Sequence, residues 1–390
     1  MALPISYNIR NLIVRWKVTL LAIGGIALVV AVMLVLVAMS NGFRTALRAT
    51  GSTENAIVIQ RGQNSELTSG FSRDNANMIM VDSRVARDDQ GKPLASPEIM
   101  IVNNMPRRQD GSSVNVVVRG VTPQAFKVRS IVKIVEGRNF TPGLYELVVG
   151  KKASERYVGL EIGHSISLQR RAWKVVGIFE ADGSGFESEI WGDLEVMGPA
   201  FNRSNGYSSL TLRLQDPSPA SLDAFNADLK RNPAMQVELI QERTFYDNQA
   251  GVISAALIGL ASFVAVVMGI GAVFGAMNTM YGIVSARTRE IGTLRALGFS
   301  RISILTSFVL ESTFLALVGG LIGCLLALPT NGISSAAGGA NFAEVAFAFR
   351  IAPAALGIGL IFAVVMGIVG GMLPAVKASR LPITSALREA

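Results

Sequence analysis

The sequence contains one cysteine and one histidine among its 390 residues. With Cys324 alone, no internal disulfide can form, so any folded domain must be stabilised by its own core. With His164 alone and no H-E-x-x-H motif, the sequence offers no typical zinc site. We expect no metal site and interpret both residues as structural.

A phosphate-binding loop is also missing. The pattern G-x-x-x-x-G-K-[ST] does not occur, and the nearest fragment, Gly150 to Lys152, lacks the preceding glycine and the following hydroxyl. We therefore expect this chain to bind no cofactor and to catalyse no reaction. Any ATP hydrolysis linked to it is expected from a separate polypeptide.

Charge is almost absent from four long stretches. A bilayer core is crossed by about 20 apolar residues, and each stretch exceeds this length. Only Glu311 interrupts one of them. We predict four transmembrane helices at residues 18–43, 251–284, 302–328 and 351–376. The first apolar run is about twice as long as a signal-peptide core, so we interpret it as a span.

The basic residues are distributed unevenly. Residues 44–250 carry 25 basic and 24 acidic residues, whereas the remainder carries 11 basic and 4 acidic residues. Ten of those eleven occur at Arg10, Arg15, Lys17, Arg287, Arg289, Arg295, Arg301, Lys377, Arg380 and Arg388. Short basic segments beside spans remain cytoplasmic, so both termini are predicted inside and residues 44–250 outside. The basic pI is then a signal of topology, and binding to nucleic acid is not expected.

The outer segment, residues 44–250, alternates runs of β-branched residues with short helical patterns. The predicted strands are Ala56–Gln60, Val114–Val121, Glu146–Gly150, Ile166–Gln169, Trp173–Phe179, Ser209–Leu214 and Val237–Ile240. The predicted helices are Lys152–Val158 and Pro219–Leu229, the second capped by Ser218. The fold class is thus a membrane protein with four transmembrane helices and a large extracytoplasmic α+β domain between helices 1 and 2.

The remaining segments are short. Residues 1–17 are predicted to form an amphipathic helix on the inner membrane surface, and residues 377–390 a cytoplasmic tail. Residues 329–350, rich in Gly, Ser and Ala, are expected to be a short external loop. The first two spans are predicted to continue outward as a stalk.

Residues 285–301 carry an amphipathic pattern on the cytoplasmic side. Ile291, Leu294 and Leu297 recur at spacing three and share a helical face. The charged residues around them are Arg289, Glu290 and Arg295, and Gly298 is expected to end the helix. The pattern is typical of a helix that docks into a groove of a soluble partner. The alternative is a surface helix that only anchors the spans.

Three further features leave alternatives open. Glu311 is a carboxylate within a span, which is functional, lies near the inner interface, or pairs with Ser or Thr on a neighbouring helix. Glu187, Glu189 and Trp191 follow a Gly-rich turn and contact either a partner or their own domain. Two small-xxx-small pairs, Gly271 with Gly275 and Gly319 with Gly323, permit close helix packing within one subunit or between two.

Three motifs occur in order along the chain. The first, Glu136 to Phe140, reads EGRNF and is followed by Glu146 to Gly150. The second, Thr288 to Gly298, reads TREIGTLRALG, and the third, Leu373 to Ile383, reads LPAVKASRLPI. These motifs resemble those of the MacB/FtsX-like family of ABC transporter permeases.

The resemblance implies a bacterial inner-membrane permease that works as a homodimer or paired permease. It implies a cytoplasmic ATPase subunit holding ATP and Mg, with residues 285–301 as the coupling helix. It also implies export of a substrate, with a periplasmic adaptor as a further partner. An FtsX-like signalling subunit that activates a cell-wall enzyme without transport is the alternative.

Overall fold

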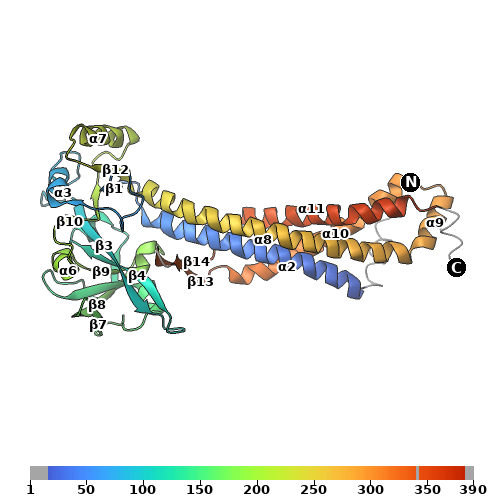
Figure 1. The fold of residues 1–390 in the computed structure, drawn as a ribbon, viewed down its shortest axis with the longest axis horizontal. Coiled ribbons are helices and arrows are strands. Elements are labelled where there is room, and N and C mark those ends of the chain that lie inside the picture. The colour runs from blue at the N-terminus through green and yellow to red at the C-terminus, as the bar shows by residue number, and fades with distance from the viewer. Residues whose placement is uncertain (1–15, 340–341, 383–390) are drawn as a thin grey trace. The chain divides into compact units, whose positions relative to one another are not determined.

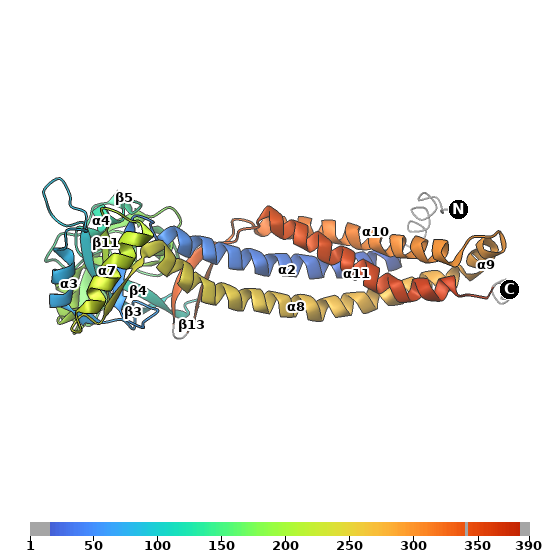
Figure 2. The ribbon, with the colours of Figure 1, turned by 90° about the horizontal axis from the view of Figure 1, so that it is seen from above.

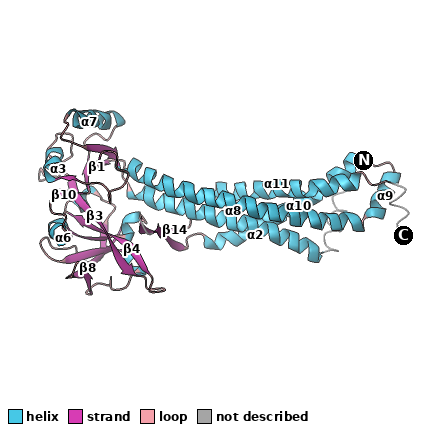
Figure 3. Cartoon of the chain, viewed as in Figure 1, coloured by secondary structure: helices cyan, strands magenta, loops and turns pink. Residues whose placement is uncertain are grey.

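The computed structural model describes residues 16–339 and 342–382, in two compact units. The helical unit comprises Met1–Asn41, Ala255–Ile333 and Phe349–Ala390, and the sheet unit comprises Gly42–Ser254 and Ser334–Ala348. Figure 3 colours helices and strands differently, and the described strands all belong to the sheet unit. The amphipathic helix expected at residues 1–17 and the end of the expected tail fall mostly outside the described residues.

Four helices among the described residues are long and apolar enough to cross a membrane, the same number that the sequence predicts. They are α2 (Trp16–Thr50), α8 (Glu242–Ala286), α10 (Arg301–Ala327) and α11 (Pro353–Ser379). At 1.5 Å per residue, the 45 residues of α8 extend for about 68 Å, more than twice the hydrocarbon thickness of about 30 Å. The second predicted span is therefore part of a helix that is longer than the bilayer core requires.

Glycines allow the helices of the helical unit to approach closely as they run along one another (Figure 2). A methyl group added at Gly323 of α10 would lie 2.6 Å from the carbonyl oxygen of Ala27 in α2. Gly319 faces α2 in the same way. This pair therefore serves packing within one chain, whereas Gly271 and Gly275 have no neighbour within 4 Å in the described part of the chain.

A mixed ten-stranded sheet forms the centre of the sheet unit, with the order β12-β1-β11-β3-β4-β9-β6-β8-β5 and β7 paired to β8. Only β4 with β9 and β6 with β8 are parallel pairs among these strands. The strands of this sheet are β1 (Asn55–Gln60), β3 (Ala95–Pro106), β4 (Ser113–Val121), β5 (Lys133–Gly137), β6 (Glu146–Gly150), β7 (Ser165–Leu168), β8 (Arg171–Glu180), β9 (Ile190–Asp193), β11 (Ser209–Arg213) and β12 (Val237–Gln241). All seven predicted strands are confirmed, whereas β3, β5 and β9 were missed.

Both faces of this sheet are covered. On β1, Ala56 and Val58 belong to one apolar cluster while Ile57 and Ile59 belong to another. Alternate residues of a strand point to opposite faces, so a continuous apolar run such as β1 indicates a strand buried on both sides. The sequence contains this signal at Asn55–Gln60.

Short helices and one small strand pair complete this part of the sheet unit. They are α3 (Arg73–Met80), α4 (Ala125–Val128), α5 (Lys151–Arg156), η1 (Gly185–Ser188), α6 (Leu194–Ala200), α7 (Pro219–Arg231), β2 (Phe71–Ser72) and β10 (Gly206–Tyr207). The predicted cap of α7 is confirmed, since the Ser218 hydroxyl accepts a hydrogen bond from the Ser221 amide.

Residues 329–350 differ from the expected loop. After η2 (Leu328–Thr330) they form an antiparallel hairpin of β13 (Ser334–Gly339) and β14 (Phe342–Ala348). Small residues conceal the strand pattern, because Ala, Ser and Gly have low strand propensity. The hairpin belongs to the sheet unit although its two ends join helices of the helical unit.

The sheet unit encloses an arginine surrounded by three carboxylates. Arg119 of β4 is fully buried and contacts Glu66, Glu98 and Glu189 at 2.7, 2.8 and 2.7 Å. Burial alone would raise the pKa of Glu66, but the charge of Arg119 and hydrogen bonds from Arg119 and Ser209 outweigh it and hold that pKa below its usual value.

A second buried arginine extends this network to α8. Arg129 forms ion pairs with Glu98 and with Glu242, the first residue of α8. Neutral donors also contribute, since the Asn55 side chain donates to Glu242 and the Tyr246 hydroxyl donates to Glu66. Four carboxylates therefore share two guanidinium groups together with polar donors, and the beginning of α8 is fixed to the sheet.

We predict that Arg119→Met destabilises the sheet unit strongly. Removing one partner of a buried ion pair costs about 3–5 kcal/mol, and this change removes the ion pairs of Glu66 and Glu189, whereas Glu98 keeps its pair with Arg129. Thermal unfolding of the purified full chain in detergent measures the loss. Arg231→Met is the matched control, because Arg231 is 81% exposed in its ion pair and surface pairs contribute about 0–1 kcal/mol. Equal effects of both changes would contradict a structural role for the network.

Candidate functional site

The segment between α8 and α10 is the candidate site. Arg287 follows α8 and is the N-cap residue of α9 (Thr288–Ala296). The helix ends where Gly298 adopts φ +96°, a conformation that glycine takes without strain, so the predicted stop is confirmed. Glu290 in the first turn and Arg295 in the last both suit the helix dipole.

One face of α9 packs against other helices of the same unit. Ile291 is 2% exposed and lies in an apolar cluster with residues of α8, α10 and α11, among them Met280, Ile304 and Ala375. Leu294 is partly buried against the same cluster. The prediction that Ile291 faces a partner protein is therefore wrong, because spacing identifies an apolar face without showing which surface covers it.

The opposite face of α9 is accessible. Arg289, Glu290 and Leu297 are exposed, and Leu297 is 73% exposed. Arg295 is half-buried. Among the predicted coupling residues, Arg289, Glu290 and Leu297 thus form an accessible surface. This surface is mainly polar, and Leu297 is its large apolar side chain.

A buried ion pair holds this segment against α10. The Arg287 guanidinium donates to Glu311 at 3.1 Å, and their side chains are 9% and 1% exposed. Arg287 also lies 5.3 Å from the centre of the Phe308 ring and 3.2 Å from Glu290. Glu311 is therefore the internal counter-ion of Arg287.

Sequence reasoning had included Glu311 as a candidate but missed its partner. It proposed Ser or Thr on a neighbouring helix, whereas the partner is a charged residue 24 positions away. A signal was present, because a carboxylate in a span requires a cation or a donor and Arg287 is the basic residue directly after the second uncharged run.

Of the two alternatives for Glu187, Glu189 and Trp191, contact with their own domain is confirmed and contact with a partner is wrong. Glu187 and Glu189 are 5% and 7% exposed and Trp191 is fully buried, so none of them is accessible to a partner. Trp191 lies on β9 among aromatic rings and donates to Glu189, which pairs with Arg119. Glu187 accepts hydrogen bonds from the 181–183 turn.

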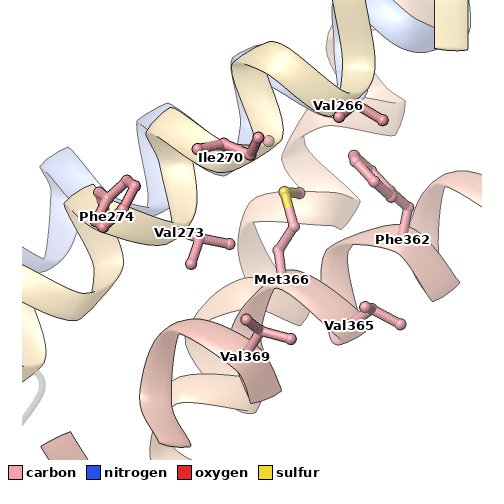
Figure 4. Close-up of a pocket in the computed structure, with 9 residues that line it drawn as sticks. Val266, Ile270, Val273, Phe274, Phe362, Val365, Met366 and Val369 are labelled. Carbon is pink, nitrogen blue, oxygen red and sulfur yellow. The ribbon is translucent and has the colours of Figure 1, made fainter. Parts of the chain in front are cut away.

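An apolar groove lies between α8 and α11 in the helical unit, with a volume of about 390 Å³ (Figure 4). Its lining includes Ile270, Phe274, Phe362 and Met366 and exposes no polar surface. It therefore offers no group that could hold a metal, a cofactor or a polar ligand.

Comparison with known proteins places these features in a family. A profile described as "MacB-like periplasmic core domain" matches residues 19–232, more than half of the chain. A second, "FtsX-like permease C-terminal", matches residues 262–383, which include α9, α10 and α11. The chain belongs to the MacB/FtsX-like family of ABC transporter permeases.

Curated members of the MacB/FtsX-like family match along most of the chain. "Pyoverdine export ATP-binding/permease protein PvdT" of Pseudomonas entomophila is 26% identical over 89% of this chain and 57% of its own length. "Macrolide export ATP-binding/permease protein MacB" of Sodalis glossinidius is 28% identical over 95% and 58%. "Uncharacterized ABC transporter permease YknZ" of Bacillus subtilis is 27% identical over 73% of both chains. This chain thus spans little more than half the length of the first two relatives.

We predict that Arg287→Met and Glu311→Leu each destabilise the helical unit, while the double variant is more stable than either single one. Arg287→Met leaves the buried carboxylate of Glu311 without this ion pair, and Glu311→Leu removes the buried partner of Arg287, which still pairs with Glu290. Breaking a buried pair costs about 3–5 kcal/mol, whereas apolar replacement of both partners is close to neutral. Thermal unfolding of the purified chain in detergent measures all three variants.

Arg301→Met serves as the control for this cycle, because Arg301 is an exposed arginine at the start of α10. It should change the midpoint little. If the losses of the two single variants simply add in the double variant, the pair is not coupled.

Proposed function

We propose that this chain is the permease subunit of an ABC transporter that couples ATP hydrolysis by a separate ATPase to movement of the sheet unit during export. The observation that carries the proposal is α9, a short helix fixed on its inner side by Ile291 and Arg287 and accessible through Arg289, Glu290 and Leu297. A fixed helix with one free face suits transmission, because force applied to that face reaches the spans without being lost in local motion.

The long helices provide a route from the spans to the sheet unit. The unit boundary falls within α2, after Asn41, and within α8, after Ser254, and both helices are continuous there. At its beginning α8 is fixed to the sheet by the Arg129–Glu242 pair. Movement at the α9 end is therefore expected to reach the sheet unit along α8.

The relatives support the ATPase and the export role. The names of PvdT and MacB describe ATP-binding/permease proteins that export pyoverdine and macrolides. These 390 residues contain no G-x-x-x-x-G-K-[ST] pattern, and we propose that ATP and Mg bind to a separate cytoplasmic subunit. Export is favoured over FtsX-like signalling by the long match to the MacB-like core profile.

The proposed setting is the bacterial inner membrane, with both termini and α9 in the cytoplasm and the sheet unit outside. The basic segments support this orientation. A second permease, identical or paired, and a periplasmic adaptor are the further partners proposed. At Gly271 and Gly275 an added methyl group would meet no atom of another described element within 4 Å, which leaves α8 a surface for a second permease or for lipid.

The orientation is tested with single cysteines. Ser113→Cys is predicted to react with a membrane-impermeant maleimide in intact cells, and Ser285→Cys only after the membrane is permeabilised. Both positions are exposed, and the native Cys324 is buried. The reverse pattern would place the sheet unit in the cytoplasm and invalidate the charge argument.

The coupling role is tested with Leu297→Asp. Leu297 is exposed, so the variant is expected to fold and insert normally, but a carboxylate now occupies an apolar contact with the ATPase. Burying a leucine contributes about 1.5–3 kcal/mol, and an unpaired charge adds a further cost. We expect at least about tenfold weaker binding, equivalent to about 1.4 kcal/mol, with loss of co-purification and ATPase stimulation.

Two controls accompany this variant. Val158→Asp changes an exposed apolar residue of the sheet unit and should leave the complex intact. Ile291→Asp should instead lower expression, since Ile291 lies in the chain's own core. A normal complex with Leu297→Asp would show that α9 only anchors the spans.

A further inference from the structure

The hairpin β13–β14 connects α10 to α11 and yet belongs to the sheet unit. The chain therefore passes between the two units four times: within α2, within α8, and at the two ends of the hairpin. A connection of small residues could be a slack linker. The contacts of β14 show a docked element instead.

Glu344 is the centre of this docking. Its side chain is 2% exposed and forms ion pairs with Arg107 at 3.0 Å and Arg156 at 3.1 Å. Arg107 follows β3 and Arg156 ends α5, so two separate parts of the sheet unit hold one carboxylate. A carboxylate is buried at this level only where counter-charges compensate its lost hydration.

The residues after Glu344 extend the contact. The Ala346 amide donates to the Ser188 hydroxyl at 2.9 Å, and Phe347 packs edge-to-face on Phe43 with ring centres 5.6 Å apart. At the end of β14, a methyl group on Gly42 would lie 2.1 Å from the Ala348 carbonyl oxygen. Gly42 is therefore needed for α2 to approach the hairpin.

We propose that this hairpin is a third mechanical link between the units, locked by Glu344, which passes movement of the sheet unit to α10 and α11. The inference rests on the proposed function and extends it beyond α2 and α8. With Glu344 paired, a displacement of the sheet unit pulls directly on the ends of both helices. With Glu344 released, the connection becomes slack and only α2 and α8 transmit.

The test uses Glu344→Gln in the full chain, bound to its ATPase and reconstituted in lipid nanodiscs, with hydrogen exchange as the readout. Amides of β14 are expected to exchange about tenfold faster than in the wild type, equivalent to about 1.4 kcal/mol of docking. Amides of the ten-stranded sheet should be unchanged, which verifies the fold. Arg107→Gln and Arg156→Gln, each removing one partner, should give smaller increases.

A non-hydrolysable ATP analogue then tests transmission. In the wild type it should change exchange in the sheet unit and in residues 328–333, at the end of α10. In Glu344→Gln the sheet unit should still respond through α8, whereas residues 328–333 should not. Glu136→Gln, at an exposed carboxylate of β5, is the matched control and should behave as the wild type.

The outcomes separate the two proposals. Unchanged β14 exchange in Glu344→Gln, or a wild-type response at residues 328–333 in that variant, would overturn the link. No nucleotide response in the wild-type sheet unit would overturn the proposed function, and the link with it. If Leu297→Asp did not weaken ATPase binding, only the proposed contact between α9 and the ATPase would be contradicted.

Discussion

The sharing of buried carboxylates by Arg119 and Arg129 is the constraint on which the sheet unit depends. Arg119 joins a residue of the 61–70 turn, a residue of β3 and the residue before β9, and Arg129 adds the first residue of α8. Hydrogen bonds with charged partners are directional, so this network sets the position of α8 on the sheet more narrowly than apolar contacts alone would. An apolar substitute of equal volume would fill the space without that directionality.

Buried ion pairs also occur at three junctions of the long helices. Glu242 is paired at the beginning of α8, Arg287 is paired directly after its end, and Glu344 is paired in the connection between α10 and α11. A buried pair adds little net stability compared with apolar residues, but breaking it is costly. Such pairs suit the proposed function, in which these junctions would retain their geometry while the helices transmit force.

Much of this arrangement could be predicted from the sequence, and the missing part has one physical cause. Spans follow from uncharged length, and β1 or β6 from continuous apolar runs, because these signals are local. The strand β13 is hidden by its small residues, and β9 was missed because it follows a Gly-rich turn. The burial of Glu189 and Trp191 depends on Arg119 and on aromatic rings brought close only by the fold, which no local pattern contains.

The segment at residues 285–301 shows the same limit of local sequence patterns within a single helix. Its apolar spacing correctly predicts a helix with a shared face for Ile291 and Leu294 but wrongly places Leu297 on that face, and Gly298 correctly predicts its end. The pattern could not show that Ile291 would be covered by the chain's own spans, because covering by a partner and covering by α10 require the same residues. The Arg287–Glu311 ion pair distinguishes these two cases, because it holds one face of the helix against the spans and leaves Leu297 exposed. An ion pair between residues 24 positions apart therefore determines which face of the helix is available to a partner. The helical period shows only which residues can share a face.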